Sequence, residues 1–232
     1  MTVAIIGAME PEVAILKQLL VDVTETTIAG FTFYAGQLND KSVVLVQSGI
    51  GKVASTIATT LIIDKFKPTL VINTGSAGGF DPELKVGDIA VANEVVHHDV
   101  DVTAFNYEFG QVPGMPARFT TSDELISLAE SCIKNLSGIT SKVGLVATGD
   151  SFMCDPERIE QTRERFPAML AVEMEGAAIA QTCHQLNTPF LIIRSLSDIA
   201  GQESPMSFEA YLEVASKNSS ALVLDIVSNF SG

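Results

Sequence analysis

The chain has 232 residues, 47% of them hydrophobic, and its 28 acidic and 14 basic side chains give a formal net charge of −14. Such an excess of negative charge repels phosphate backbones and anionic lipid heads, so we expect neither nucleic acid nor a membrane as a partner. The apolar fraction is enough for one large core, and we expect a single domain over residues 1–232.

The N-terminal segment and the cysteines favour a cytoplasmic protein. No uninterrupted apolar run reaches the roughly 18 residues that span a bilayer. Residues 1–13 contain an apolar run without the basic lead-in of a signal peptide. Cys132, Cys154 and Cys183 are widely spaced and fit neither a disulfide framework nor a zinc site, so we expect no metal.

Apolar runs alternate with amphipathic segments along most of the chain. The runs that we predict as strands cover residues 3–9, 31–38, 42–49, 69–75, 87–96, 141–149, 170–174 and 189–195. Several are apolar at successive positions, which is typical of a sheet with both faces covered. The segments that we predict as helices cover residues 11–23, 51–66, 121–136, 155–166 and 208–230. This alternation predicts an α/β fold on a mostly parallel sheet.

One long segment, residues 97–119, has aromatic, glycine and proline residues without the period of a helix or a strand. Loops of this length in compact domains are usually functional or lie at an interface. Two interpretations stay open, an ordinary surface loop or a contact with a ligand or partner. The aromatic side chains favour the contact.

Two glycine-rich segments follow predicted strands. Residues 49–54, GIGKVA, match the G-x-G-x-x-A pattern of dinucleotide-binding proteins. However, the next strand ends in residues 73–80, NTGSAGGF, without the carboxylate that would hold a ribose. We therefore interpret the first segment as glycines that let the backbone approach a ligand or a helix. The second lies where open α/β folds place ligands, and Ser76 is a candidate to bind one.

Acidic side chains recur at the ends of predicted strands. Glu12 follows the first strand, where the positive end of a helix also explains a glutamate. Glu173 and Glu175 lie two apart in an apolar segment, and Asp198 follows a buried strand that carries Arg194, a candidate partner for one glutamate. Carboxylates that converge on one pocket suit cleavage through an oxocarbenium-like transition state. One acid protonates the leaving group and another carboxylate activates water.

Eight motifs follow one another in an order typical of a known family. They are IIGAMEPEV, QSGIGKV, INTGSAGG, VGDI, HHDVDVTAF, TGDSF, AVEMEGAAIA and RSLSDIA, and they extend over essentially the whole chain. In these motifs the chain closely resembles the bacterial 5′-methylthioadenosine/S-adenosylhomocysteine nucleosidases of the nucleoside phosphorylase superfamily. The resemblance implies a three-layer α/β fold, with a mixed central β-sheet flanked by helices, and a homodimer. It also implies hydrolysis of an N-glycosidic bond, giving adenine and a 5-thioribose product, without a metal or an organic cofactor.

The resemblance further implies roles for residues in the matching motifs. Asp198, oriented by Ser197, resembles the general acid that protonates adenine N7, and burial would keep it protonated near neutral pH. Glu12 resembles the base that activates water, and Glu175 resembles the residue that holds the ribose hydroxyls. We place Glu173 in the same substrate site as a structural member.

Further residues are implied to contact the adenine nucleoside or the attacking water. They are Ser76 and Arg194 for the water, Phe152 and Met153 for adenine, Met174 for the ribose, and Met9, Ile50 and Phe208 for the 5′-thio group. In the family the loop at residues 97–116 reaches across the dimer. Val102, Phe105 and Pro113 would therefore complete the pocket of the other subunit.

Three functions remain as alternatives at this stage. The one we favour is hydrolysis of 5′-methylthioadenosine and S-adenosylhomocysteine, extending to 5′-deoxyadenosine. The second is a purine nucleoside phosphorylase of the same superfamily, which needs cationic side chains around a phosphate dianion. The first loop offers Glu10 and Glu12 but no arginine, which favours a neutral water. The third is a nucleoside-binding protein that releases no adenine.

Overall fold

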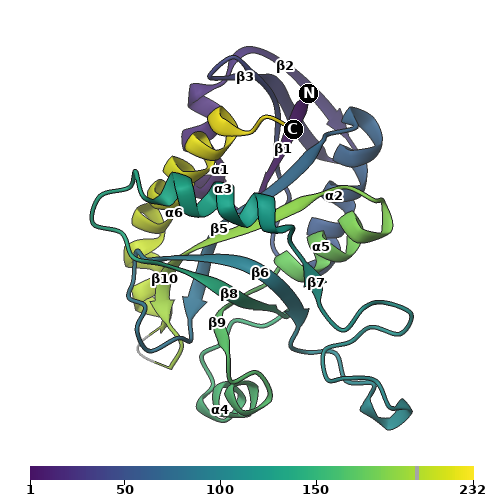
Figure 1. Cartoon of the computed structure of the whole chain (residues 1–232), viewed down its shortest axis with the longest axis vertical. Helices are drawn as coiled ribbons and strands as arrows, with labels where there is room; N and C mark the ends of the chain where they lie inside the picture. The colour runs from purple at the N-terminus through teal and green to yellow at the C-terminus, as the bar shows by residue number, and fades with distance from the viewer. Residues whose placement is uncertain (202–203) are drawn as a thin grey trace.

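A mixed β-sheet runs through the centre of the computed structural model, which describes residues 1–201 and 204–232 (Figure 1). Its strands are β1 Thr2–Gly7, β2 Val21–Ile28, β3 Phe31–Leu38, β4 Lys41–Gln47, β5 Leu70–Gly79, β6 Ile89–His97, β7 Phe119–Thr120, β8 Ser141–Thr148, β9 Met169–Glu173 and β10 Phe190–Ile199. The helices are α1 Glu10–Leu19, α2 Lys52–Phe66, the 3-10 helix η1 Thr103–Phe105, α3 Asp123–Ile133, α4 Pro156–Arg165, α5 Gly176–Gln185 and α6 Ser204–Asn229.

The sheet is open at one end and closes on itself at the other. From the open edge the strands run in the order β2, β3, β4, β1 and β5. The long strand β5 pairs with β10 along one edge and, near its end, with β9 along the other. Because β10 pairs with β6, and β6, β8 and β9 pair in turn, these five strands form a closed ring. Parallel and antiparallel pairs coexist, which confirms the predicted mixed sheet.

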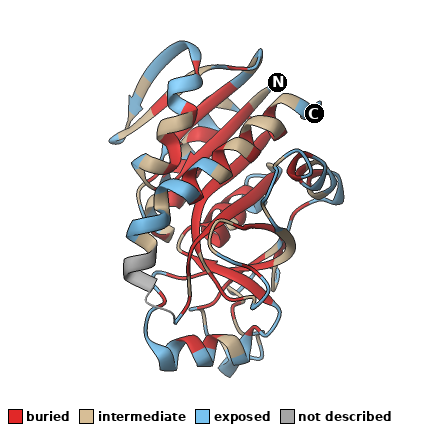
Figure 2. Ribbon diagram, turned by 90° about the vertical axis from the view of Figure 1, so that its left-hand side faces the viewer, coloured by how far each residue is buried: buried red, intermediate tan, exposed pale blue. Residues whose placement is uncertain are grey.

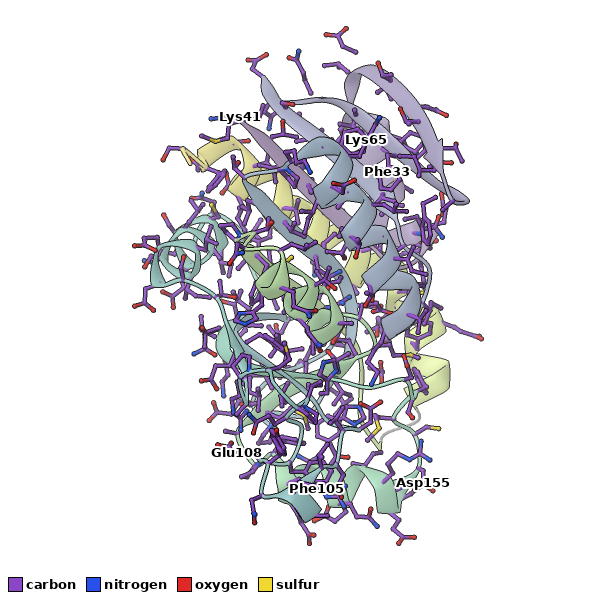
Figure 3. The ribbon with its side chains drawn as sticks, turned by 90° about the vertical axis from the view of Figure 1, so that its right-hand side faces the viewer. Phe33, Lys41, Lys65, Phe105, Glu108 and Asp155 are labelled. Carbon is purple, nitrogen blue, oxygen red and sulfur yellow. The ribbon has the colours of Figure 1, made fainter. Side chains whose placement is uncertain are left out.

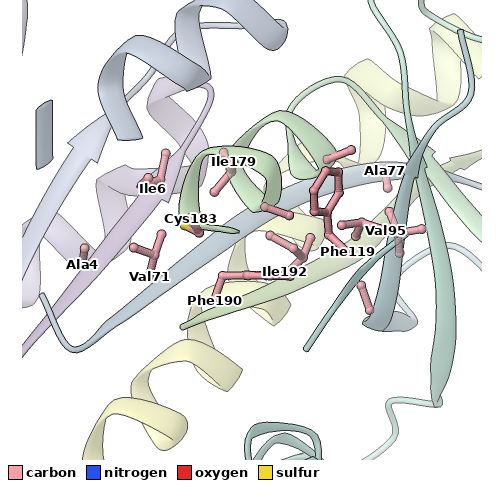
Figure 4. Close-up of a cluster of buried hydrophobic side chains, with 14 of the residues drawn as sticks. Ala4, Ile6, Val71, Ala77, Val95, Phe119, Ile179, Cys183, Phe190 and Ile192 are labelled. Carbon is pink, nitrogen blue, oxygen red and sulfur yellow. The ribbon is translucent and has the colours of Figure 1, made fainter. Parts of the chain in front are cut away.

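Helices cover both faces of the sheet, because strands that are apolar at successive positions need partners on both sides. On one face, α2 and α5 pack on the strands in a cluster where Ile6, Ile179 and Ile192 meet (Figure 4). On the other face, α1, α3 and α6 cover the alternate side chains of the same strands. Figure 2 shows the buried strands between helices whose outer faces are exposed. The predicted three-layer architecture is therefore confirmed.

A third apolar cluster lies under α4, where Ile159 and Phe166 pack on Leu145 and Met153. The loop that follows β6 lies at this same end of the molecule, opposite the open edge of the sheet (Figure 1). In Figure 3, Phe105 of that loop and Asp155 at the start of α4 both lie at this end. The closed ring and its surrounding loops thus form the half of the molecule that can enclose a ligand.

Several elements differ from the sequence-based prediction, among them β5, which continues to Gly79 instead of ending at residue 75. Helix α1 ends at Leu19, and residues 21–28 form the largely exposed strand β2, so the helix predicted over 11–23 was wrong in its last turn. Helix α5 was not predicted, because its residues are buried nearly all round and offer no polar stripe. Strand β10 continues to Ile199 instead of ending at residue 195, so that Asp198 lies inside the strand.

Candidate active site

A cavity of about 380 Å³ opens where β1, β5, β9 and β10 end. It is lined by Ala8, Met9, Glu12, Ile50, Ser76, Ala77, Gly78, Ser151, Phe152, Met153, Val172, Glu173, Met174, Glu175, Ser197, Asp198 and Phe208. Four of these residues carry carboxylates, and each of those side chains is at most 7% exposed. The cavity therefore concentrates acidic groups in an otherwise apolar pocket, and the chemistry depends on what holds each group.

Glu12 is held entirely by hydrogen-bond donors. It lies at the third position of α1, and its Oε2 accepts hydrogen bonds from the backbone N–H groups of Ala8, at 2.8 Å, and Met9, at 3.1 Å. Its Oε1 accepts from the N–H and the hydroxyl of Ser76, both at 2.9 Å. All four of these contacts are with N–H or O–H donors, so the side chain of Glu12 acts as a hydrogen-bond acceptor. Glu12 is thus placed as an acceptor that faces the ligand space.

The glycine before Ser76 explains how the β5 backbone comes so close to Glu12. A Cβ atom at Gly75 would lie 2.6 Å from both Glu12 Oε1 and Arg194 Nη1, well inside any tolerated contact. Only glycine leaves room for these two charged side chains to approach the strand. The NTGSAGG segment is therefore a packing requirement of the site.

Asp198 lines the cavity from the irregular stretch of β10 where its pairing with β5 shifts register. The Ser197 hydroxyl lies 2.9 Å from Asp198 Oδ1 and 3.4 Å from the carbonyl oxygen of Ala77. Both residues are buried. The register shift brings the two neighbouring side chains together at the cavity wall, which an unbroken strand would not do.

Glu173 and Glu175 have different environments although they are two residues apart. Glu173 ends β9, and its carboxylate accepts hydrogen bonds from Thr148, Arg194 and two backbone N–H groups. Glu175 accepts one backbone hydrogen bond, from Gly51 at 2.8 Å, and its Oε2 lies 3.4 Å from Arg194 Nη2. Gly51 has a φ of +93°, which favours glycine and turns its N–H towards the carboxylate.

Burial raises the pKa of Glu175 to about 7. Desolvation of the charged carboxylate is the main cause, and the negative charges of Glu173 and Glu12 act in the same direction. The positive charge of Arg194 and the hydrogen bond from Gly51 oppose the shift. Glu175 therefore changes its charge near neutral pH, unlike a surface glutamate.

Arg194 is fully buried behind the carboxylates and does not line the cavity. Its Nη2 donates to Glu173 and to Asn73, whose amide in turn donates to the carbonyl oxygen of Ile6. The predicted pairing of Arg194 with one of the glutamates is confirmed, and Glu173 is the closer partner. The neighbouring acidic charges favour the charged form of Arg194 and raise its pKa, although burial acts in the opposite direction.

The apolar walls come from three loops and from α6. Phe152 and Phe208 meet edge to face, with ring centroids 5.8 Å apart, and Met153 is buried beside them. On the other side, Met9 and Ile50 border the opening, and Ile50 is 57% exposed. Flat aromatic and thioether surfaces of this kind suit a planar base and an apolar substituent.

The structure brings together most of the residues that the sequence singled out. Those that line the cavity are Met9, Glu12, Ile50, Ser76, Phe152, Met153, Glu173, Met174, Glu175, Ser197, Asp198 and Phe208. Arg194 lies behind the wall. Val102, Phe105 and Pro113 do not line this cavity, and Phe105 is 74% exposed on the loop after β6.

Sequence reasoning missed polar residues that support the cavity wall. Thr148 ends β8 and bonds to Glu173, and Asp150 accepts a hydrogen bond from the N–H of Lys52 at 2.8 Å. Both lie at the carboxyl end of a buried strand, which is the signal that led to Asp198. The same signal applied to the TGD segment would have found them.

Two kinds of feature are absent from residues 1–201 and 204–232. No group of three or more His, Cys, Asp or Glu side chains there is arranged to hold a metal ion. Nor does that part of the chain contain a helix with the length and hydropathy to cross a bilayer.

Comparisons with known proteins agree with one another. A family model described as the phosphorylase superfamily matches residues 2–228. The 5′-methylthioadenosine/S-adenosylhomocysteine nucleosidase of Pseudoalteromonas translucida is 64% identical over 227 residues, 98% of this chain and 97% of the relative.

Solved structures give the same result. The nucleosidase of Colwellia psychrerythraea, in complex with adenine, is 59% identical with a TM-score of 0.96, covering 98% of this chain and 94% of that one. The nucleosidase of Neisseria meningitidis, in complex with methylthio-immucillin-A, is 47% identical with a TM-score of 0.97, covering 99% of each chain. The similarity thus extends over nearly the full length of the fold.

Proposed function

The chain belongs to the 5′-methylthioadenosine/S-adenosylhomocysteine nucleosidases of the phosphorylase superfamily and hydrolyses N-glycosidic bonds, and we propose that the carboxylates of its cavity perform this reaction. Asp198 is the acid, Glu12 is the base and Glu175 holds the ribose. The observation that carries the proposal is that Glu12, Glu175 and Asp198 line one buried cavity with different hydrogen-bond partners.

Departure of adenine needs a proton. Asp198 donates it to N7 as the C1′–N9 bond breaks, and the electron pair of that bond stays on the base, which leaves as neutral adenine. Ser197, at 2.9 Å, keeps the carboxyl group in one orientation. Phe152 and Met153 lie on the same wall and support a bound purine, with Phe152 placed to stack on the ring.

The ribose ring becomes cationic as the bond breaks, and negatively charged carboxylates of the cavity stabilise it. Glu175 accepts hydrogen bonds from the ribose hydroxyls beside Met174, and Glu12 lines the same cavity. Carboxylates fixed in a buried pocket stabilise a developing oxocarbenium ion more than they would in water. Glu12 then takes a proton from the attacking water, which Ser76 helps to position, with Arg194 stabilising the carboxylates behind it.

The electrostatics favour water over phosphate as the nucleophile. Glu12, Glu173 and Glu175 all face the cavity, and a phosphate dianion would meet their negative charge. Arg194 offers no compensation, because it is fully buried and already engaged with Glu173. This arrangement supports hydrolysis over the phosphorolysis of the alternative purine nucleoside phosphorylase.

The 5′ side of the pocket supports a nucleoside with an apolar 5′ substituent. Met9, Ile50 and Phe208 border this part of the cavity. An apolar wall accepts a methylthio group, and it accepts a bare methyl with only a modest loss of burial, about 1–3 kcal/mol. We therefore include 5′-deoxyadenosine among the substrates, beside 5′-methylthioadenosine and S-adenosylhomocysteine.

A second subunit would cover the exposed side of the site. Val53, Ile57 and Ile50 present apolar side chains along α2 and the loop before it, with exposed fractions of 72%, 42% and 57%. The start of the loop after β6 is tied to α2 by Asp99, which accepts two hydrogen bonds from Lys52 at 2.7 and 2.8 Å. An exposed apolar surface of this kind marks an interaction site. We propose a homodimer in which Val102, Phe105 and Pro113 complete the partner's pocket.

An adenine-release assay in phosphate-free buffer tests the proposed function. The substrates are 5′-methylthioadenosine, S-adenosylhomocysteine and 5′-deoxyadenosine, and the expected result is stoichiometric adenine and free sugar without added phosphate. Release that depends on phosphate, with a sugar 1-phosphate as product, would show a phosphorylase. Binding without release would show a nucleoside-binding protein.

A further inference from the structure

The first backbone N–H groups of α5 are bound by side chains from outside the helix. Glu173 Oε2 accepts from the N–H groups of Glu175, at 2.9 Å, and Gly176, at 2.7 Å. The hydroxyl of Thr148 accepts from the N–H of Ala177 at 2.7 Å and donates to Glu173 Oε1. One carboxylate and one hydroxyl, supplied by β9 and β8, therefore cap this helix.

Glu175 occupies the N-cap position of α5 yet does not cap it. Side-chain oxygens at this position commonly accept from the second or third N–H of their own helix, and the positive end of the helix dipole attracts a carboxylate there. Here Glu175 makes no such side-chain bond, and its Oε1 instead accepts from Gly51, the residue before α2. The N–H groups that would attract it are already occupied by Glu173 and Thr148.

We propose that Glu173, together with Thr148, is a positioning residue that keeps Glu175 in the cavity. The inference rests on the proposed function, in which Glu175 holds the ribose. Glu173 takes over the capping of α5, so the carboxylate of Glu175 is left to face the ligand. Both carboxylate oxygens of Glu173 are already engaged, Oε1 by Thr148 and Oε2 by Arg194 and two backbone N–H groups, which fits this role better than a direct contact with the substrate.

Glu173 also determines which carboxylate Arg194 pairs with. Arg194 is fully buried, bonds to Glu173 and lies 3.4 Å from Glu175 Oε2. The charged groups that face Glu175 are Glu173 from β9, Arg194 from β10 and Glu12 from α1. Without the negative charge of Glu173, the carboxylate left beside Arg194 Nη2 is that of Glu175. The arginine and the uncapped helix would then both draw Glu175 away from the ribose.

The variant Glu173→Gln keeps the shape of the side chain and removes its charge. We expect kcat/KM for 5′-methylthioadenosine to fall about 100-fold, the scale of a 1 Å misplacement of a group that positions substrate. KM should rise, because the ribose loses its acceptor. Inhibition by adenine, which has no ribose, should be unchanged from wild type, because Phe152 and Met153, the proposed contacts of the adenine base, are not disturbed. Weakened adenine inhibition would show general damage to the cavity and overturn the proposal.

A double-mutant cycle with Glu175→Gln isolates the route of the effect. If Glu173 acts through Glu175, the pair of substitutions should cost little more than Glu175→Gln alone, because coupled residues are not additive. Additive losses would overturn the proposal. Failure of the wild-type protein to release adenine is a different result, since it would refute the proposed function itself.

Thr148→Val provides a second variant without any change of charge, should Glu173→Gln fold poorly. It removes the buried hydroxyl that bonds to Ala177 and Glu173, and we expect kcat/KM to fall about tenfold while adenine inhibition is kept. Thr148→Ser, which restores the hydroxyl, should recover most of that loss. Thr182→Val is the matched control, because it removes a buried hydroxyl on α5 itself, bonded to Ala178, away from the helix start. Equal losses in Thr148→Val and Thr182→Val would count against the proposal.

Discussion

Three buried carboxylates of one cavity differ in what surrounds them. Glu12 accepts only from uncharged donors, Glu173 is saturated by protein groups, and Glu175 has a single backbone donor and a raised pKa of about 7. All three residues are glutamates, so the hydrogen-bond donors around each carboxylate decide its role. A glutamate saturated by the protein supports the fold, and one with acceptor capacity left can serve a ligand.

Removal of either proposed proton-transfer group should nearly abolish turnover. Asp198→Asn and Glu12→Gln each keep the shape of the side chain, and loss of general acid or general base catalysis typically lowers the rate by about 10²–10⁴-fold. The measurement is kcat for adenine release beside circular dichroism and thermal unfolding. A folded variant with wild-type kcat would contradict the role given to that residue.

Nucleoside binding should release a proton from Glu175 at mildly acidic pH. Ribose hydroxyls donate to the ionised carboxylate, so affinity for a non-hydrolysable nucleoside should rise as pH increases through about 7. Folding stability has the opposite dependence. Because the folded pKa lies above the ordinary value of 4.5, the contribution of Glu175 is complete below that value and is lost as pH rises through about 7.

Titration calorimetry in buffers of different ionisation enthalpy measures the released protons. The Glu175→Gln protein, in which this position carries no proton to release, serves as the control. Binding of the nucleoside analogue with no pH dependence between about pH 5 and pH 8 would contradict the assignment.

At the scale of single residues, the sequence predicted the cavity well where a polar side chain interrupts an apolar run. Glu12, Glu175 and Asp198 were found in this way, and they lie together in the structure. The partner of a polar residue was harder to predict. Thr148 was missed because a threonine in a strand is unremarkable by composition, and only its contact with Glu173 shows its importance.

Secondary-structure elements were predicted wherever their patterning had a clear period. Strands β1, β4 and β6 were found from their apolar runs, and α3 from its amphipathic spacing. Helix α5 has no such contrast, since it is packed between α2 and the sheet, and β2 offers few buried residues to pattern. The extension of β10 to Ile199 was missed because polar side chains in a strand signal a loop unless a ligand site explains them.

Helices α2 and α4 are both capped by aspartates, and of these two caps the one on α2 is connected to the cavity. Asp150 accepts from the first N–H of α2, and Asp155 caps α4 by accepting from Arg158. Either substitution to alanine should lower the free energy of unfolding by about 0.5–2 kcal/mol. Asp150→Ala should also raise KM, because its loop carries Phe152, whereas Asp155→Ala should leave KM unchanged. Urea unfolding measures the change in stability, and adenine release measures KM. Equal KM values for Asp150→Ala and Asp155→Ala would contradict the link between the start of α2 and the loop that carries Phe152.

On the scale of the whole molecule, the exposed apolar side chains of α2 and of the loop after β6 predict that the active form has two subunits. Val53→Asp places a charge in this surface and should shift the protein to monomers in analytical ultracentrifugation. Adenine release should fall about tenfold or more with it, because each apolar side chain lost from a pocket removes about 1.5–3 kcal/mol of burial.

Val21→Asp is the control for this experiment. Val21 is 56% exposed on β2, at the open edge of the sheet and away from α2. The Val21→Asp substitution should leave both the number of subunits and the rate of adenine release unchanged. A Val53→Asp protein that stays dimeric, or a monomer with full activity, would contradict the proposed subunit arrangement.

The position of Arg194 in the chain has a consequence for folding during synthesis on the ribosome. Glu12, Glu173 and Glu175 are all synthesised before β10, the strand that brings their buried counter-charge. Until that strand is added beside β5, burial of these acids would leave them without a cation, at a cost of several kcal/mol for each ion. A nascent chain that lacks β10 should therefore keep this region hydrated. The arrival of one arginine, after more than four-fifths of the chain has been made, permits the core around the cavity to close.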